Sequence, residues 1–555
     1  MAKPRSRPQL SLEGAPVADD AAGIPPNHWS RLFFQHVFCR FDEAQFASLY
    51  EDRGRQPISP ALLASVTILQ YMQKASDRVA VDNTVMRRDW RIALGRDKQW
   101  TGFDPSVLCN FRKRLVAHGM QRELFEAVLD TLRDLDLLSQ RRRLRVDATH
   151  LLSDVATLSR CDALREAIRI VVCDLEKHAP ELHERLDFLR LHEAYGAEVW
   201  LGGAHADEQA LSELGRDAQA LLELCGARQV RGKEVLAQML TENFTFPPDE
   251  VPRPLEPDAR PGDPIVTPHE PDARVGKHGD KLWIGDKVHV TETADEGRAN
   301  FIVDVMSTDP RVDDSTVLEQ LAQRLRLRLP GADQLLADSG YASATNTLRA
   351  AAAGIDLVAP ARANTSRGRV AASEFNLDFR RRIATCPAGH DSTYWRAHGR
   401  QLTIRFHAAT CAGCPLRARC TTSPRGRTLG LSIDHEQLVK DRERAASAEF
   451  AQLYARRAGI EATISHLARD CGLRRSRYRG RPKRELHGLL AATGLNVRRL
   501  LQWLASGEGL DEALSGAFSR RLGAVPRRAQ RALAAIMGPI VGSGREPGLA
   551  VTAVA

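Results

Sequence analysis

Three acidic residues, far apart along the chain, stand in contexts that suit metal-ion chemistry. Asp147 lies in the short stretch Leu144-Arg-Val-Asp-Ala-Thr, whose apolar residues alternate with polar ones as in a strand. Asp338 ends the apolar stretch Gln334-Leu-Leu-Ala-Asp, and Glu461 lies in a segment with helical spacing. Because catalytic groups collect at strand ends in open α/β sheets, we expect the three carboxylates to converge there.

Converging carboxylates are suited to bind divalent cations, since Mg²⁺ takes oxygen ligands and keeps several of its waters. Two such ions about 4 Å apart support an in-line displacement at phosphorus. One ion activates a water or a DNA 3′-hydroxyl, and the other stabilises the leaving oxygen, so no Ser or Cys nucleophile is required. Taken singly, an Asp at a strand end is more often a cap or turn residue. Asp286, Asp304 and Asp313 are rival carboxylates for the same role.

The elements that would position these acids come from distant parts of the chain. Residues 440–470 are expected to form one long helix that carries Glu461, and Asp313 is suited to cap a helix that runs to about residue 327. The strand-like stretches are 144–149, 282–291, 300–307, 334–338 and 355–360. This order predicts an α/β fold with a mixed sheet and flanking helices.

Periodicity and composition divide the chain into segments. Two inserts interrupt the sheet-forming parts, and an all-helical domain precedes them. The predicted segments are a disordered arm over 1–27, a helical DNA-binding domain over 28–140, a catalytic core over 141–157, 276–360 and 440–505, a helical insert and linker over 158–275, a Cys-containing insert over 361–439, and a basic, mostly disordered tail over 506–555.

Basic residues are concentrated in runs that suit a nucleic-acid partner. The chain has 79 Lys and Arg against 70 Asp and Glu, a net charge of +9. The densest run extends from Arg474 to Arg484 and includes Arg475 and Arg477. Such density is what neutralising phosphates along a duplex requires, so we interpret this run as a DNA contact rather than as a solvated basic face.

A second basic feature lies in the helical N-terminal domain. The helix expected from Val107 carries Arg112 and Lys113, and several short helices around it suit a helix-turn-helix DNA-binding module. A plain helical bundle explains the same pattern equally well, so both readings stay open here.

The sequence favours a soluble protein of a reducing compartment. The N-terminus lacks the apolar core of a signal peptide, and no apolar run reaches the roughly 20 residues that span a bilayer. Ten cysteines in 555 residues are too sparse for a disulfide scaffold. We therefore expect a cytoplasmic location and no membrane partner.

Four cysteines are clustered between 386 and 420. Cys411 and Cys414 have the C-x2-C spacing of a thiolate site for Zn²⁺, with Cys386 and Cys420 as the other two ligands and His390 as a substitute for one of them. The first part of the motif lacks a second cysteine, so reduced cysteines packed in a small insert are an equal alternative. His289 is expected to be a solvent-facing or structural histidine rather than a ligand.

The three acids and their surroundings resemble the DDE transposases of bacterial insertion sequences. The resemblance is carried by Leu144-Arg-Val-Asp-Ala-Thr, by Leu336-Ala-Asp-Ser-Gly-Tyr, and by Tyr454-Ala-Arg-Arg-Ala-Gly-Ile-Glu, which matches a Tyr-x2-Arg-x3-Glu pattern. It covers most of residues 28–505 and implies a ribonuclease-H-like catalytic core, as in retroviral integrases. Gly285-Asp-Lys-Val-His-Val and Gly102-Phe-Asp-Pro-Ser are supporting resemblances.

The resemblance implies roles for individual residues. Asp147, Asp338 and Glu461 would bind two Mg²⁺ (or Mn²⁺) ions, while Tyr454 and Arg457 would contact the DNA end being processed. The branch usually has a Lys seven residues after its Glu; here that position is Ala468, with Arg469 beside it as the candidate contact. The implied partners are double-stranded DNA, as element ends and target, and a second copy of the chain in a synaptic complex associated with the bacterial nucleoid.

Two other functions compete with transposition. A non-mobile nuclease of the same fold would cut DNA without joining a 3′-hydroxyl to a target. A relic without catalytic activity would bind DNA through its basic helices alone, although the three intact acids argue against it.

Overall fold

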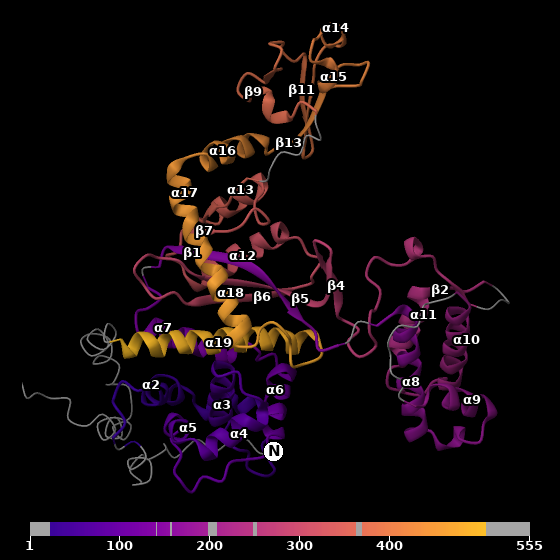
Figure 1. Cartoon of the computed structure of the whole chain (residues 1–555), viewed down its shortest axis with the longest axis vertical. Coiled ribbons are helices and arrows are strands. Elements are labelled where there is room, and N and C mark those ends of the chain that lie inside the picture. Colours follow the sequence, from indigo (N-terminus) through magenta and orange to yellow (C-terminus); the bar gives the residue numbers. More distant parts are fainter. Residues whose placement is uncertain are drawn as a thin grey trace, which may run out of the picture. The chain divides into compact units, whose positions relative to one another are not determined.

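The computed structural model describes residues 21, 23–139, 141–155, 158–197, 208–247, 252–361 and 369–506. The chain divides into two compact units, each assembled from segments distant in sequence (Figure 1). The predicted arm over 1–27, apart from residues 21 and 23–27, and the predicted tail beyond residue 506 lie outside the described residues. The first unit comprises Met1–Leu138, Leu151–Asp286 and His466–Ala555, and the second comprises Ser139–His150 and Lys287–Ser465.

The N-terminal part of the first unit is helical, which confirms the prediction. Its centre is α3 (Pro60–Met72), all of whose residues are buried. Ser59 caps this helix by accepting a hydrogen bond from Leu62 N–H, and Pro60 lies in the first turn, where its missing N–H removes no helical bond. The other helices here are α2 (Trp29–His36), α4 (Asp77–Met86), α5 (Arg88–Ala93), α6 (Ser106–Ala117) and α7 (Glu123–Asp134).

The C-terminal helix α19 (Arg481–Ala505) packs against α3 and α7. Gly494 permits the close approach, because a Cβ there would lie 2.8 Å from the backbone nitrogen of Met72. The sequence analysis assigned 440–505 to the catalytic core. The structure differs, since α19 buries its long apolar face against the N-terminal helices rather than on the sheet.

The helical insert of the first unit has a hydrophobic core of its own. Its helices are α8 (Arg160–His178), α9 (Leu186–Tyr195), α10 (Glu208–Cys225) and α11 (Lys233–Asn243). Apolar residues at helical spacing, among them Ile168, Leu221 and Leu236, form this core. The segment after it contains β2 (Phe244–Thr245), β3 (Arg253–Pro254) and β4 (Arg274–His278), and β4 pairs antiparallel with residues 281–285.

A mixed sheet forms the middle of the second unit. Its strands are β4, β1 (Arg143–Leu152), β5 (Lys281–Thr293), β6 (Ile302–Thr308), β7 (Gln334–Leu336) and β8 (Asp356–Val358). They follow the order β4–β5–β1–β7–β8, and β6 also pairs with β5. β5 and β6 are antiparallel, as the predicted hairpin requires, whereas β7 is parallel to both β1 and β8. α12 (Asp314–Arg328) packs on β6 and α13 (Ala344–Ala352) on β8, and Asp313 caps α12 as expected.

The single long helix predicted over 440–470 is wrong in detail. The segment consists of α16 (His435–Ala445), α17 (Ala448–Ala455), a 3-10 turn (Arg456–Ala458) and α18 (Gly459–Asp470). Ser447 separates the first two helices, because its side chain accepts from Phe450 N–H and starts a new helix. Phe450 and Leu453 of α17 pack against Leu336 and Val358 at the ends of β7 and β8.

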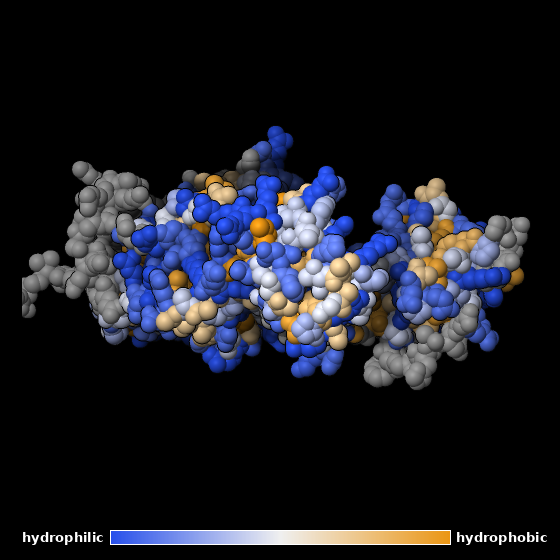
Figure 2. Space-filling view, turned by 90° about the horizontal axis from the view of Figure 1, so that it is seen from above, coloured by the Kyte–Doolittle hydropathy of each residue, from blue (hydrophilic) through white to orange (hydrophobic). Residues whose placement is uncertain are grey.

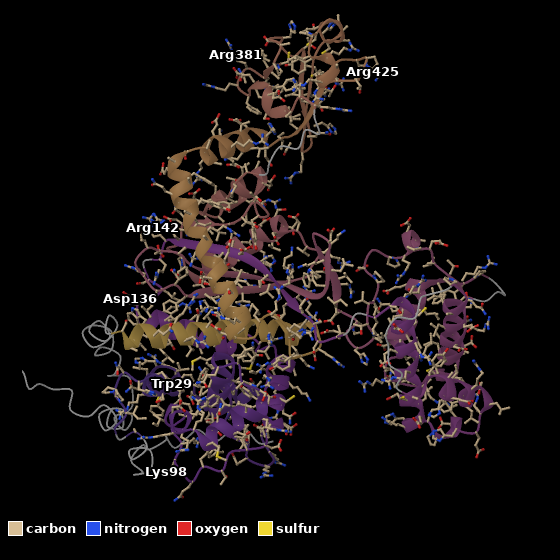
Figure 3. The ribbon with its side chains drawn as sticks, in the orientation of Figure 1. Trp29, Lys98, Asp136, Arg142, Arg381 and Arg425 are labelled. Carbon is tan, nitrogen blue, oxygen red and sulfur yellow. The ribbon has the colours of Figure 1, made fainter. Side chains whose placement is uncertain are left out.

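The Cys-containing insert is a small β-rich body between β8 and α16. It has a two-stranded sheet of β9 (Asn376–Asp378) and β10 (Ile383–Thr385) and a three-stranded sheet of β11 (Tyr394–His398), β12 (Gln401–Arg405) and β13 (Thr428–Ser432). The short helices α14 (Ala408–Ala412) and α15 (Arg417–Cys420) lie between β12 and β13. Figure 3 labels Arg381 and Arg425, two exposed side chains of this insert.

Most coloured residues on the face drawn in Figure 2 are hydrophilic, with scattered apolar ones between them. Within the described part of the chain, no helix combines the length and the apolar character needed to cross a membrane.

Candidate active site

Two of the predicted acids lie on neighbouring parallel strands of the second unit. In the β1–β7 pairing, Arg145 is opposite Leu336. Continuing this register by two residues on each strand brings Asp147 level with Asp338, and the period of two in a strand directs both side chains to the same face. Asp338 follows the end of β7, where its carboxylate accepts a hydrogen bond from Gly340 N–H at 2.8 Å.

Glu461 comes to these acids from the first turn of α18. The turn that precedes α18 is held by Arg145, which donates from Nη1 to the backbone oxygen of Arg456 at 2.7 Å. Gly459 is required at the start of α18, because a Cβ there would lie 1.9 Å from that Nη1 atom. Arg145 thus fixes the path of the chain between Tyr454 and Glu461.

A buried ion pair lies beneath this contact. The Arg145 guanidinium binds Glu292 of β5, with Nε and Nη2 each 2.7 Å from Oε1, and the Glu292 side chain is 0% exposed. The Thr463 hydroxyl of α18 lies 2.9 and 2.8 Å from the two Glu292 oxygens and donates to this carboxylate. One carboxylate therefore ties β5, β1 and α18 together.

Arg457 bridges two of the three acids. Its Nη2 lies 2.8 Å from Asp147 Oδ2, and its Nη1 lies 3.4 Å from Glu461 Oε1. Its Nε is buried and has no hydrogen-bond partner among the described residues. Buried polar groups are nearly always hydrogen-bonded, so this N–H is suited to donate a hydrogen bond to an anionic ligand.

The acids and their neighbours act on one another electrostatically. Burial raises the pKa of Asp147, and the charges of Asp338 and Glu461 raise it further, while Arg457 and Ala148 N–H act in the opposite direction. Burial also raises the pKa of Tyr454, on which Arg457 and all three acids act. Tyr454 stacks on Phe450, with ring centroids 5.6 Å apart.

Three carboxylates within electrostatic reach are the hard oxygen donors that Mg²⁺ prefers, so the donor chemistry fits. Their atoms are not arranged as ligands: among the described residues, no three or more His, Cys, Asp or Glu side chains are grouped so as to hold a metal ion. Arg457 balances the charges of Asp147 and Glu461 instead.

A buried tyrosine–histidine pair lies next to the acids. Tyr341 is fully buried, and its hydroxyl is 2.6 Å from His289 Nδ1, while His289 Nε2 is 3.0 Å from Thr308 Oγ1. Burial raises the pKa of Tyr341, and the charges of Asp314, Asp147 and Asp338 add to this effect. Burial lowers the pKa of His289 to about 4, with a smaller contribution from Lys287. His289 is a structural histidine.

The rival carboxylates are all engaged elsewhere. Asp286 pairs with Arg484 at 2.5 Å within the first unit. Asp304 is buried against Arg324 at 2.6 Å, and Asp313 caps α12 by accepting from Ser315 N–H.

Three of the predicted basic DNA contacts, Arg112, Lys113 and Arg477, line a cavity of about 320 Å³ in the first unit. Lys113 of α6 lines this cavity, together with Arg477, Arg479 and Lys483 from the segment that leads into α19. Tyr478 is held in its wall, with its hydroxyl 3.2 Å from that of Tyr71.

Arg112 does not fit the predicted role of an accessible phosphate contact. It is 4% exposed, pairs with Asp77 at 2.5 Å and lies over the Tyr478 ring. The reason is that α6 turns this position toward α3 and α4, while the adjacent Lys113 is turned to solvent.

The remaining predicted contacts are spread over the first unit. Arg474 and Arg475 are exposed. Arg477 donates to the backbone oxygen of Ala75 at 2.6 Å, and Arg469 is exposed beside Asp470 at 2.9 Å.

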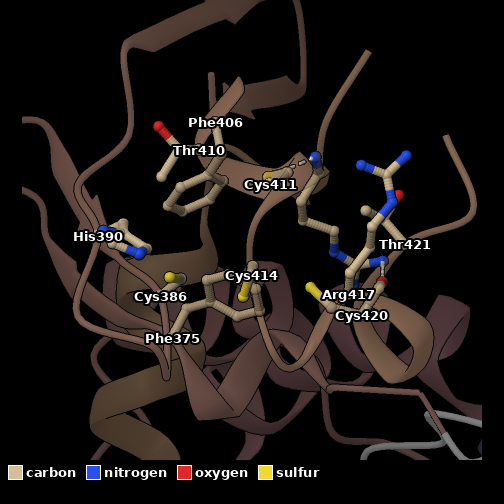
Figure 4. Close-up of a pocket in the computed structure, with 11 residues that line it drawn as sticks. Phe375, Cys386, His390, Phe406, Thr410, Cys411, Cys414, Arg417, Cys420 and Thr421 are labelled. Carbon is tan, nitrogen blue, oxygen red and sulfur yellow. Dashed lines mark hydrogen bonds between the residues drawn. The ribbon is translucent and has the colours of Figure 1, made fainter. Parts of the chain in front are cut away.

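The four predicted zinc ligands line one small cavity of the insert, as does His390 (Figure 4). Cys386 follows β10, and Cys411 lies on α14. Cys414 lies in the turn before α15, and Cys420 is the last residue of α15. Burial raises the pKa of Cys420, and the other three thiols act on it in the same direction. All four are free cysteines.

Two comparisons identify the kind of protein. Residues 21–114 match the family model described as a transposase domain (DUF772), and residues 385–501 match the model described as a transposase DDE domain. No curated protein and no solved structure matched the chain. The match to a DDE transposase domain implies a phosphoryl-transfer enzyme, and the two matches together indicate a DNA transposase function.

Sequence reasoning missed several residues that support the site. Arg145 stands two positions before Asp147 in the same strand, so strand alternation alone could have assigned both to one face. Glu292 and Thr463 carry no such signal, because only the fold brings them to Arg145. Arg479 and Lys483 belong to the basic run from Arg474 to Arg484. The sequence of that run does not predict that they share a cavity with Lys113.

Removing one partner of the buried pair is expected to be severely destabilising. Arg145→Leu leaves Glu292 buried without its cation, which costs about 3–5 kcal/mol of the free energy of unfolding. The double variant Arg145→Leu, Glu292→Leu should recover part of that loss, because no uncompensated charge remains. Chemical denaturation of both variants measures this coupling. Equal destabilisation by the single and double variants would contradict the pairing.

The buried His289 predicts a pH-dependent contribution to stability. Its pKa is about 4 in the folded chain against an ordinary value of 6.5, so the unfolded state takes up its proton first as pH falls. The stability present above pH 6.5 is lost progressively down to about pH 4, and amounts to about 3 kcal/mol. In His289→Gln, the unfolding free energy should fall less steeply over this window. An identical slope in both proteins would show that His289 does not titrate as described.

Proposed function

We propose that this transposase binds the terminal inverted repeats of its own element and catalyses metal-dependent strand cleavage and strand transfer. Asp147, Asp338 and Glu461 would hold the catalytic Mg²⁺ or Mn²⁺ ions. The observation that carries the proposal is that acids from three distant segments act on one another electrostatically beside the buried, unpaired Nε of Arg457.

The ions would activate the attacking oxygen and stabilise the leaving one. The chain's own residues do the rest. The Arg145–Glu292 pair fixes the helix that carries Glu461, and the buried Tyr341–His289 pair lies within electrostatic reach of Asp147 and Asp338. Arg457 and Tyr454 are proposed to contact the DNA end, because a phosphate oxygen supplies the acceptor that Arg457 Nε lacks.

We also propose that the second unit has a ribonuclease-H-like core. Support comes from the mixed sheet, in which the first strand is central, an antiparallel pair lies on one side and two parallel strands on the other. Asp338 follows the end of β7, where catalytic groups of such sheets collect, while Asp147 lies in the middle of the adjacent strand β1.

Two basic regions are proposed to hold DNA. One is the cavity of Lys113, Arg477, Arg479 and Lys483, and the exposed Arg469, Arg474 and Arg475 extend the basic surface of the first unit. The other is the insert, where residues 369–432 contain eleven Arg and three Asp or Glu. Such an excess of cations serves phosphate contacts that carry no base specificity.

Substituting any of the three acids should abolish catalysis without abolishing DNA binding. Asp147→Asn, Asp338→Asn and Glu461→Gln remove ligand charge while keeping side-chain size. Strand cleavage and strand transfer on DNA carrying the element's terminal repeats should each fall on the order of 10³-fold, about 4 kcal/mol of barrier. Asp313→Asn is the matched control, since Asn also caps a helix and Asp313 is not in the proposed triad.

The same assay separates the competing functions. Cleavage without joining of a 3′-hydroxyl to a target would indicate a nuclease. Excision that proceeds unchanged in the acid variants would indicate a DNA-binding relic and end the proposal.

The basic cavity predicts a measurable salt dependence. Neither Lys113 nor Lys483 forms an ion pair with a described residue, so both are available to phosphates. The double variant Lys113→Gln, Lys483→Gln should lower the slope of log K against log salt for duplex DNA by roughly 2, since each phosphate contact contributes about 0.9. Binding is measured with EDTA present, so catalysis does not enter. The control pair Lys98→Gln, Lys177→Gln should leave the slope unchanged; equal slopes in all three proteins would rule the cavity out.

A further inference from the structure

The cysteine cavity of the insert lies outside the proposed catalytic chemistry and has a composition of its own. It is lined by four cysteines and one histidine from three separate segments of the insert (Figure 4). All four sulfurs are free thiols, which excludes disulfides among them in this structure. Four thiols that share one cavity are rarely required for packing alone, because any small apolar residue would fill the same volume.

The size of the cavity limits what it can hold. Its volume is about 20 Å³, which is enough for a single ion or water. Of the single ions that thiolates bind, Zn²⁺ is the one that forms redox-inert tetrahedral sites with four sulfur ligands.

The insert also needs an additional source of stability. Its hydrophobic core consists of eight buried residues, and three of the four cysteines pack against it. Its sheets have two and three strands. Bodies of this size commonly depend on disulfides or a metal, because their apolar core alone offsets too little of the conformational entropy.

Two arginine side chains, Arg417 and Arg427, line the cavity together with the thiols. Cys411 Sγ accepts a hydrogen bond from Arg427 N–H at 3.4 Å, and the Arg427 side chain donates to the backbone oxygen of Cys420 at 2.9 Å. Two guanidinium groups beside four thiolates offset the net negative charge that a tetrathiolate zinc site carries.

We propose that Cys386, Cys411, Cys414 and Cys420 form a structural zinc site. Among the described residues these side chains are not grouped as metal ligands, so the proposal rests on their shared cavity and on their donor chemistry. Each thiol releases its proton to solvent on binding, and no electron is transferred. The ion would cross-link the turn after β10 to α14 and α15, and so fix the arginine-rich surface of the insert.

The test is the metal content of the full-length chain, purified without a histidine tag and without added chelator. We expect about one zinc per chain in the wild type, and a loss of at least nine-tenths of it in Cys411→Ser, Cys414→Ser. The matched control Cys39→Ser, Cys173→Ser removes the same number of thiols outside the insert and should keep the metal. Zinc retained in the insert variant, or absent from the wild type, overturns the proposal.

A second measurement covers the case in which the insert variant does not fold. Wild-type chain grown with Co²⁺ should show sulfur-to-cobalt charge-transfer absorption and intense d–d bands of a tetrahedral thiolate site. His390→Ala should keep this spectrum, because His390 is not one of the four ligands. A spectrum without charge-transfer bands, or bound iron with visible absorption, contradicts a zinc site. These readouts do not depend on DNA cleavage, so they remain informative whether or not the proposed transposition activity is found.

Discussion

The buried ion pair between Arg145 and Glu292 is the constraint on which the candidate active site depends. A carboxylate with no exposed surface is stable only if its charge and hydrogen bonds are fully compensated. Arg145 supplies the charge, and Thr463 supplies a further donor. Because these residues come from β1, β5 and α18, the pair can form only when three segments separated by more than a hundred residues are brought together. The contacts that satisfy Glu292 therefore also bring together the segments that carry Asp147 and Glu461.

The charge arrangement above that pair follows from the same geometry. Asp147 is two residues beyond Arg145 on one face of β1. Arg457 lies in the 3-10 turn, next to the Arg456 carbonyl that accepts a hydrogen bond from Arg145. The Arg457 guanidinium neutralises two acids, and its Nε–H has no acceptor among the described residues. This arrangement is compatible with a metal ion or a phosphate bound nearby. Partial burial strengthens each of these interactions relative to water, which explains why the charges of Asp338 and Glu461 act on the pKa of Asp147.

Charge is distributed differently elsewhere in the chain. The first unit presents cations from α6 and from the segment before α19 around one cavity, and the insert carries a large excess of arginine. Neither region has the buried carboxylates of the sheet. A positively charged surface attracts DNA over long range, whereas the acids are suited to bind cations at short range. The proposed DNA contacts and the proposed catalytic residues therefore come from separate parts of the sequence.

Local sequence determined the elements whose causes are local. Periodicity and capping over a few residues account for the β5–β6 hairpin, the Asp313 cap, the N-terminal helices, the strand that contains Asp147 and the strand that precedes Asp338. The break between α17 and α18 did not, because it arises from Arg145, three hundred residues away in sequence. The burial of Arg112, the docking of α19 on α3 through Gly494, and the meeting of Lys113 with Lys483 likewise depend on which faces pack together. Tertiary structure alone decided them, since a side chain's burial and partners are properties of the assembled core and leave no periodic trace in the chain.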